Sequence, residues 1–256
     1  MQQNFTMNSL QALLYFPFKD SGSRNRLLIA SALGFASFII PVIPWILLLG
    51  YAGAIMKQII VEKQEPSMPD WKNWSDYLLL GGKLFGVNLI YSIPVFIPML
   101  LGYFGMILPA FIGILSGDPN GYSNSDQFVG ITMLFSFGGM GLFGIGMIFS
   151  IILWVFLPPA LAHVAARDSF AAGFQFRDWW AIFKANIGGF LLSIIIAGGL
   201  YMVMVFALQI IYMTIILCAL LPFLLAFISA YLTIVIFTLF AQAYREGIIK
   251  LENQIP

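Results

Sequence analysis

Long apolar runs alternate with short polar segments along the chain. Five apolar stretches stand out, at residues 27–56, 84–116, 128–162, 185–220 and 222–244. A helix that crosses the roughly 30 Å hydrocarbon core of a membrane needs about 20 residues. Each of the last four stretches is long enough to cross once, so the pattern predicts a helical membrane protein that crosses the membrane several times.

The first stretch, residues 27–56, does not fit this simple pattern. As one helix it has a length of about 45 Å, too long for one upright crossing and too short for two full ones. Pro41 and Pro44 lie at its centre. We expect a hairpin of two short helices, shallow or re-entrant, with the prolines at its tip. The alternative is one steeply tilted helix, which would place the N-terminus on the outer side.

Composition strengthens the membrane assignment. Hydrophobic residues make up 61% of the chain and charged residues only 9%, against about 25% charged residues in an ordinary soluble domain. The net charge of +1 gives no reason to expect a nucleic-acid partner. The single cysteine, Cys218, excludes a disulfide within one chain and a zinc site built from thiolates. The first 26 residues lack the pattern of a cleaved signal peptide, so we expect them to be retained.

The positions of the basic residues predict the topology. All 12 Lys and Arg residues fall between the long apolar stretches or beside the ends of the chain, and such residues are retained on the cytoplasmic side. We therefore expect both termini to be cytoplasmic. The polar loop 117–127 contains Asp118 and Asp126 but no basic residue, so we expect it to be external. The expected cytoplasmic segments are residues 1–26, 57–83, 163–184 and 245–256.

The polar segments also indicate an internal repeat. An aromatic and charged segment precedes apolar sequence at residues 16–20, 70–74 and 176–180. The third of these has the spacing of an amphipathic helix in the membrane interface. We expect an all-α membrane protein in which residues 1–256 form a single polytopic domain. It would be a bundle of about six transmembrane or re-entrant helices, built from three degenerate repeats with interfacial amphipathic segments.

Four motifs carry a resemblance to a known family: FPFKD at 16–20, MPDWKNWSDYLLLGGK at 68–83, AAGFQFRDWWAIFKAN at 171–186 and AQAYREG at 241–247. With these motifs the chain resembles the uncharacterised prokaryotic membrane proteins grouped as domain of unknown function 4013, over nearly its whole length. The resemblance implies a multi-pass protein of the prokaryotic plasma (inner) membrane. It transfers no functional residue, because the family has no assigned activity.

Candidate chemistry is sparse. The only histidine, His163, lies near Arg167 and is expected to be an interfacial structural residue. Asn88 and Gln209 are the deepest polar side chains, expected either to bond between helices or to line a polar path. Basic–acidic doublets recur at Lys19-Asp20, Arg167-Asp168, Arg177-Asp178 and Arg245-Glu246. The expected contacts to a lipid or a partner are Arg177, Asp178, Trp179, Arg245 and Glu246.

The sequence pattern bears on three function classes. The favoured one is a non-enzymatic protein that organises membrane lipids or a partner, either another membrane protein or a second copy of the chain. The alternative is a transporter or channel for a weakly polar small molecule, suggested by the repeats, the proline breaks and the glycine-rich spans. An enzyme is not expected, because one histidine, one cysteine and no paired intramembrane carboxylates offer no catalytic residues, metal site or cofactor site.

Overall fold

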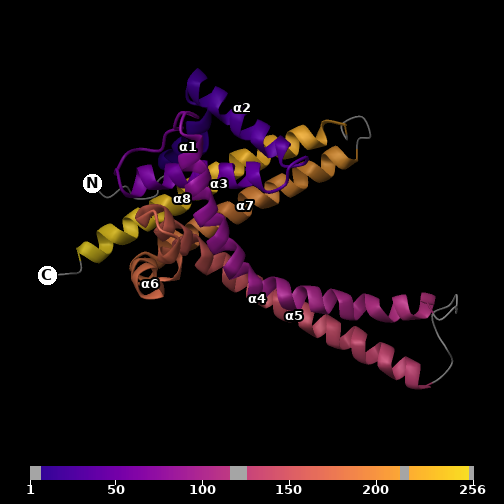
Figure 1. Ribbon diagram of the computed structural model, residues 1–256. Coiled ribbons are helices and arrows are strands. Elements are labelled where there is room, and N and C mark those ends of the chain that lie inside the picture. The colour runs from indigo at the N-terminus through magenta and orange to yellow at the C-terminus, as the bar shows by residue number, and fades with distance from the viewer. Residues whose placement is uncertain (1–6, 116–125, 214–218, 254–256) are drawn as a thin grey trace. The chain divides into compact units, whose positions relative to one another are not determined.

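The computed structural model describes residues 7–115, 126–213 and 219–253 (Figure 1). These residues are helical or lie in short connections, and no strand occurs among them. The helices are α1 (Met7–Tyr15), η1 (Phe16–Phe18), α2 (Ser21–Ala36), α3 (Ile43–Ile60), α4 (Trp74–Leu115), α5 (Asp126–Arg167), η2 (Phe170–Phe174), α6 (Phe176–Ala185), α7 (Ile187–Tyr212) and α8 (Leu221–Glu252). Among the described residues, five helices are long and apolar enough to cross a membrane: α3, α4, α5, α7 and α8.

Local sequence explains where several helices begin. The carboxylate of Asp20 caps α2 by accepting a 2.7 Å hydrogen bond from the backbone N–H of Ser23. Pro44 and Pro222 lie in the first turns of α3 and α8, where the missing N–H of proline costs no helical hydrogen bond. Residues 37–42, which include Pro41, separate α2 from α3. The first apolar stretch is therefore two helices and not a single one.

The other sequence boundaries shift in detail. The helix expected from residue 84 begins at Trp74, so α4 has 42 residues with Pro94, Pro98 and Pro109 inside it. Most of the loop 117–127 lies outside the described residues, as does Cys218, while α5 begins at Asp126. Leu221 begins α8, in agreement with a break between the last two apolar stretches.

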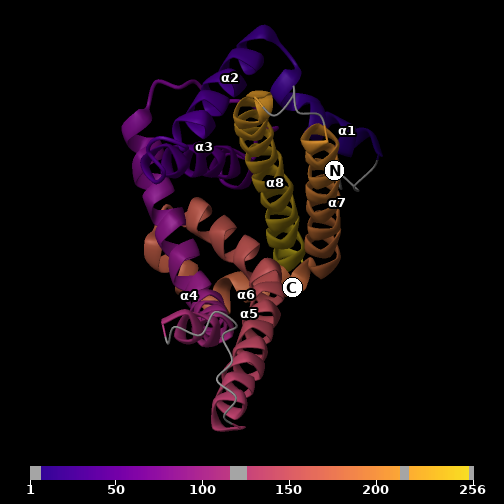
Figure 2. The ribbon, with the colours of Figure 1, turned by 90° about the vertical axis from the view of Figure 1, so that its right-hand side faces the viewer.

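The chain divides into two compact units. Unit 1 contains residues 1–87 and 158–256, and unit 2 contains residues 88–157. In unit 1, α8 packs against α1, α2, α3, α6 and α7. Figure 2 shows α7 and α8 side by side. Ala230, Ile234 and Val235 of α8 are fully buried, so this helix supplies much of the core of unit 1.

Close helix packing in unit 1 depends on glycine. A Cβ atom on Gly50 of α3 would overlap the carbonyl oxygen of Tyr77 in α4, and one on Gly81 would overlap the carbonyl oxygen of Ile46. The backbones of α3 and α4 therefore approach directly, as small residues allow in membrane helices. The adjacent Gly82 faces open space, with no atom within 4 Å of an added Cβ.

Unit 2 contains the C-terminal part of α4 and the N-terminal part of α5, which pack through a second set of glycines. A Cβ on Gly102 would lie 2.5 Å from the carbonyl oxygen of Gly139, and one on Gly105 would lie 3.1 Å from the Cα of Gly139. Most other side chains of this unit are exposed apolar groups, such as Phe104 and Phe137. In water this exposure would be unfavourable, but in lipid it is the ordinary state of a helix surface.

Helix α6 is amphipathic, as its sequence predicts. Trp179, Ile182 and Phe183 are buried, whereas Arg177 and Lys184 are exposed. The apolar face packs against α8, where a Cβ on Gly247 would lie 2.7 Å from the carbonyl oxygen of Ile182. Protein therefore covers the face that the sequence assigned to lipid.

Candidate functional site

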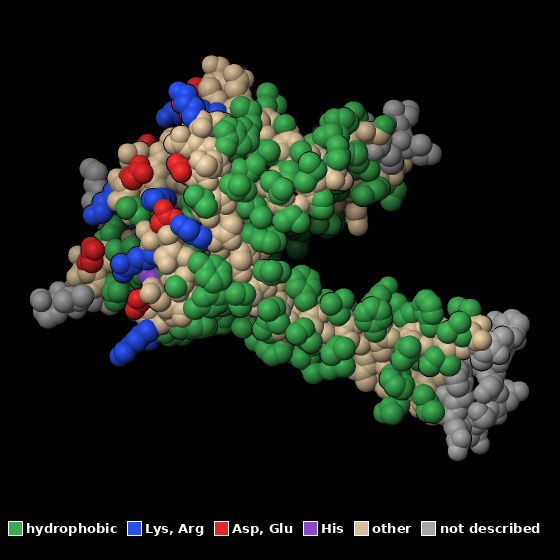
Figure 3. Space-filling model, viewed as in Figure 1, with side chains coloured by type: hydrophobic (Ala, Val, Ile, Leu, Met, Phe, Trp, Pro, Cys, Tyr) green, Lys and Arg blue, Asp and Glu red, His purple; other side chains and the backbone are tan. Residues whose placement is uncertain are grey.

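Charged side chains gather at one end of unit 1 on the face shown in Figure 3, and hydrophobic side chains cover most of the rest of that face. The contacts at this end form three polar clusters. The first surrounds the turn at residues 68–71, the second surrounds Asp168, and the third surrounds His163 and Asn186.

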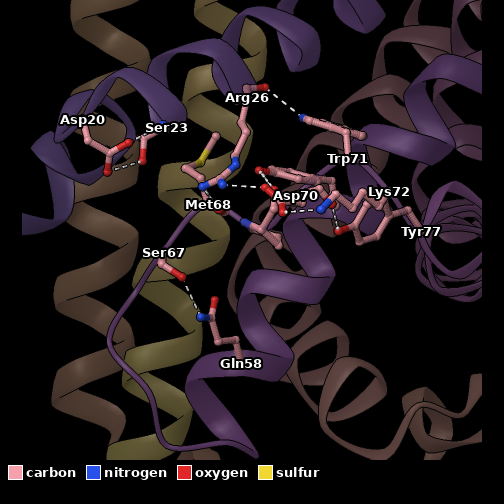
Figure 4. A network of polar contacts seen from close by, with 12 residues as sticks. Asp20, Ser23, Arg26, Gln58, Ser67, Met68, Asp70, Trp71, Lys72 and Tyr77 are labelled. Atoms are coloured by element: carbon pink, nitrogen blue, oxygen red, sulfur yellow. Dashed lines mark hydrogen bonds and ion pairs between the residues drawn. The ribbon is translucent and has the colours of Figure 1, made fainter.

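The first cluster joins the start of α2 to the 68–71 turn (Figure 4). The guanidinium of Arg26 donates to the carbonyl oxygen of Met68 at 2.7 Å and to the carboxylate of Asp70 at 2.5 Å. The hydrogen bond and positive charge of Arg26 lower the pKa of the Asp70 carboxyl group. Lys72 lies 3.5 Å from the same carboxylate but is largely exposed. The turn is thus held by charge-assisted hydrogen bonds from one arginine.

Aromatic residues complete this cluster. The indole of Trp71 donates to the carbonyl oxygen of Arg26 at 2.9 Å, and its ring stacks on Tyr51 with centroids 4.0 Å apart. The hydroxyls of Tyr51 and Tyr77 donate to the carbonyl oxygens of Pro69 and Asp70 at 2.8 and 2.7 Å. The 68–71 turn therefore links α2, α3 and α4, which explains the Pro-Asp-Trp motif by structure alone.

The second cluster is an ion triad of Lys57, Lys83 and Asp168. The ammonium of Lys57, near the end of α3, lies 2.9 Å from one carboxylate oxygen of Asp168. The ammonium of Lys83 in α4 lies 2.6 Å from the other oxygen and 2.9 Å from the carbonyl oxygen of Asp168. The hydrogen bonds from Lys83 and then Lys57 lower the pKa of Asp168. Asp168 adopts φ 50°, a left-handed conformation that ends α5 and that Asp and Asn tolerate.

The third cluster contains the single histidine. His163, which is 1% exposed, lies with Nδ1 2.5 Å from the hydroxyl of Tyr244 and with Nε2 3.2 Å from Oε1 of Gln175. An amide oxygen can only accept, so Nε2 carries the proton and Nδ1 accepts from the tyrosine hydroxyl. This neutral imidazole joins α5, α8 and the segment before α6. The geometry suits a structural histidine.

Asn186, between α6 and α7, extends the third cluster. Its amide nitrogen donates to the carbonyl oxygen of Ala243 at 2.8 Å and to the carboxylate of Glu246 at 3.3 Å. Its amide oxygen accepts from Lys250 at 2.6 Å. Asn186 is 2% exposed and its polar atoms are bonded, so it fixes the start of α7 against α8.

The predicted contact residues lie on two helices that pack against each other. Arg177 and Asp178 of α6 are exposed, and Arg245 and Glu246 of α8 are half-buried. Trp179 is fully buried, and its indole donates to the carbonyl oxygen of Gly173 at 3.2 Å. Trp179 therefore has no surface for a lipid or a partner in this structure and serves to pack α6.

The two residues proposed to line a polar path belong to different units. Asn88 is half-buried in unit 2, where its carbonyl oxygen accepts from Ser92. Gln209 is exposed near the end of α7 in unit 1.

The basic–acidic doublets do not form one cluster among the described residues. Asp168 is the member that takes part in the ion pairs, and its partners are Lys57 and Lys83, which belong to no doublet. Asp20 instead caps α2, and Glu246 accepts from Asn186. The acidic members Asp20, Asp168 and Glu246 thus make separate contacts within unit 1. No group of three or more metal-ligating side chains occurs among the described residues.

Comparison with known protein families identifies the family of this chain. The model of the family described as "Protein of unknown function (DUF4013)" matches residues 33–213. The chain belongs to this family. The matched DUF4013 segment includes the 68–71 turn, His163 and α6, but it excludes the motifs at 16–20 and 241–247, so it is shorter than the resemblance suggested. No curated protein and no solved structure matches the chain.

Two contacts made by residues of the DUF4013 segment were not predicted from the sequence, and both are long-range. Lys57 and Asp168 are 111 residues apart, and His163 and Tyr244 are 81 residues apart. Neither pair has a local spacing that would indicate a contact. The one available signal was the position of both lysines and Asp168 in segments expected to share the cytoplasmic side.

Proposed function

We propose that this DUF4013 protein is a non-enzymatic, multi-pass protein of the prokaryotic plasma membrane that organises lipids or a partner through the charged end of unit 1. The observation that carries the proposal is the segregation of charge in unit 1, where charged groups lie at one end and exposed apolar groups cover most of the remaining face (Figure 3). Such a surface suits a headgroup layer at one end and hydrocarbon along the helices.

The same segregation supports the proposed topology. The basic residues of the chain lie near the starts of α2 and α4, near the ends of α3, α5 and α8, in the connection between α3 and α4, and in α6, which precedes α7. The positive-inside tendency then places these helix ends, and both termini, in the cytoplasm. In this arrangement α2 and α3 form the proposed re-entrant hairpin. The 16 residues of α2 amount to about 24 Å, less than a full crossing.

Contacts between successive segments support the three proposed repeats. The repeats would be the pairs α2–α3, α4–α5 and α7–α8, each preceded by an aromatic and charged segment. In the middle of α3, within the first pair, the hydroxyl of Tyr51 donates to the carbonyl oxygen of Pro69 in the segment that begins the second pair. Near the end of the second pair, His163 bonds to Gln175 in the segment that begins the third. Tyr231 of α8 donates to Leu14, ahead of the first pair, at 3.0 Å.

Topology mapping tests the membrane part of the proposal. Reporter fusions that are active only in the cytoplasm should be active at both termini, and a fusion within the loop 117–127 should be inactive. The same loop fused to a periplasmic reporter provides the matched positive control. Termini on opposite sides would overturn the proposed re-entrant hairpin.

Retention of lipid or protein tests the organising role. The protein should be extracted gently from native membranes and its bound lipids and proteins identified by mass spectrometry. Arg177→Ala and Arg245→Ala should reduce retention of an anionic lipid or a partner, because both side chains lie at the charged end. Arg24→Ala, at the exposed start of α2, is the matched control. Unchanged retention in both variants would remove these arginines from the role.

The second candidate is a transporter or channel for a weakly polar solute. It is favoured by the glycine-rich packing of α4 and α5 in unit 2 and by the three prolines inside α4, because a broken helix can line a polar cavity. Flux into proteoliposomes, with wild-type protein and with Asn88→Ala and Gln209→Ala, would test it. Vesicles that remain impermeable to the solutes tried would leave the organising role as the better account.

A further inference from the structure

The ion triad of Lys57, Lys83 and Asp168 has an unbalanced charge. Two ammonium groups share one carboxylate, which leaves a formal charge of +1. The side chains are 39%, 33% and 44% exposed, so a ligand can reach all three. A structural ion pair needs one cation for each carboxylate, and the second lysine exceeds that requirement.

The ammonium groups also retain hydrogen-bonding capacity. Each lysine carries three N–H donors. Lys57 directs one of them to Asp168, and Lys83 directs two. Within the described part of the chain, three donors thus remain beyond the contacts to Asp168. Three donors and one positive charge match the oxygens and the charge of a single phosphodiester group.

Apolar surface lies beside the charged groups. The ring of Phe170, which is 41% exposed, rests against Gly86, three residues along α4 from Lys83, where an added Cβ would lie 2.9 Å from the ring. Gly82 leaves open space next to Lys83. Leu79 of α4, one helical turn before Lys83, is exposed at 66%. A molecule bound at the lysines would therefore have hydrocarbon surface within reach along α4.

We propose that Lys57 and Lys83 bind the phosphate headgroup of an anionic phospholipid, with Phe170 and the adjacent surface of α4 contacting its acyl chains. The proposal rests on the membrane location proposed above and adds a specific site to it. In this site Asp168 positions the two ammonium groups and competes with the phosphate for them. The lipid is chosen over a free phosphate because the cations lie beside apolar surface.

Lipid retention measures the site directly. The full-length protein should be placed in micelles with equal amounts of phosphatidylglycerol and phosphatidylcholine, and the retained lipids counted by native mass spectrometry. Lys57→Gln and Lys83→Gln should each reduce retained phosphatidylglycerol about fivefold, with phosphatidylcholine unchanged. Lys72→Gln is the matched control, because Lys72 is 84% exposed and lies outside the triad. Equal loss in all three variants would show only a general charge effect and would overturn the site.

Asp168→Asn separates lipid binding from a purely structural ion pair. Asparagine has nearly the same shape and tolerates the left-handed conformation at this position. Because the variant removes the competing carboxylate, phosphatidylglycerol retention should rise above that of the wild type. A purely structural triad predicts lower stability and unchanged or reduced retention, and that result would overturn the proposal.

Two further outcomes distinguish the ligand and the scope of failure. If millimolar inorganic phosphate displaces the retained signal, the site binds a free anion, and the lipid assignment is wrong. If phosphatidylglycerol is retained but is insensitive to Lys57→Gln and Lys83→Gln, this site fails while the broader organising role stands. If the protein retains no anionic lipid at all, the lipid form of the proposed function fails with it.

Discussion

The hydroxyl of Tyr244 lies 2.5 Å from Nδ1 of His163, although the two residues are 81 positions apart in the chain. Both side chains are 1% exposed, so water does not reach them and each supplies the hydrogen-bond partner that the other needs. The contact joins α5 to α8 and, through Gln175, to the segment before α6. Stability and not proton transfer is the role that this arrangement favours.

Loss of the tyrosine hydroxyl should therefore destabilise the protein. Tyr244→Phe leaves Nδ1 of His163 buried without its partner, at a cost of about 1–3 kcal/mol. The measurement is the thermal unfolding midpoint in detergent. Tyr15→Phe is the control, because Tyr15 is 62% exposed. Equal midpoints for Tyr244→Phe and the wild type would contradict the importance of this contact.

Glycine packing between α3 and α4 gives a prediction with a neighbouring control. Gly81→Ala places a Cβ against the carbonyl oxygen of Ile46, so the helices must separate, and we expect a loss of about 1–3 kcal/mol. Gly82→Ala meets no atom within 4 Å and should be neutral or stabilising by up to about 1 kcal/mol. Unfolding midpoints of the two variants measure the difference. Similar effects at both positions would refute direct contact between the backbones.

The stability of unit 1 should fall in acid through Asp168. Its folded-state pKa is lowered by Lys83 and Lys57, so it lies below the unfolded-state value of about 3.9. The contribution of the triad is therefore fully present above about pH 4 and is lost as the pH falls through the folded-state pKa. Unfolding midpoints between pH 6 and pH 3 should decline less steeply in Asp168→Asn than in the wild type. Asp76→Asn, at an exposed position of α4, should keep the wild-type slope.

The indole of Trp71 should be needed at the 68–71 turn. Trp71→Phe keeps an aromatic ring against Tyr51 but removes the 2.9 Å hydrogen bond to the carbonyl oxygen of Arg26. The expected loss is about 0.5–1.5 kcal/mol in the free energy of unfolding. Trp74→Phe, at a 42% exposed side chain, is the matched control. A larger loss in the control would place the important tryptophan at residue 74.

Much of the helical architecture could be predicted from the sequence, because it follows from local properties. Apolar run length indicated the helices that are now candidate membrane spans, and Pro41 and Pro44 indicated the break between α2 and α3. The amphipathic spacing around Trp179 and Phe183 predicted α6. Each of these features depends on residues within a few turns of one another.

The polar clusters could not be predicted, because they depend on tertiary contacts. The doublet Arg167-Asp168 does not indicate which groups Asp168 contacts, because its partners come from α3 and α4. Trp179 resembled a headgroup anchor, but α6 packs its apolar face on α8, which buries the indole. Periodicity identifies an apolar face, but it does not tell whether lipid or protein covers that face.

The central position of α8 has a consequence for biosynthesis. A ribosome completes α2 and α3 well before α8, yet these early helices pack against α8 in the finished unit. In the proposed membrane topology, lipid or an insertion factor would cover the surfaces of α2 and α3 that later contact α8 until that helix is inserted. The assembly of unit 1 is therefore completed only after α8 has been synthesised. Before that point, the exposed surfaces of α2 and α3 can form non-native contacts with other proteins.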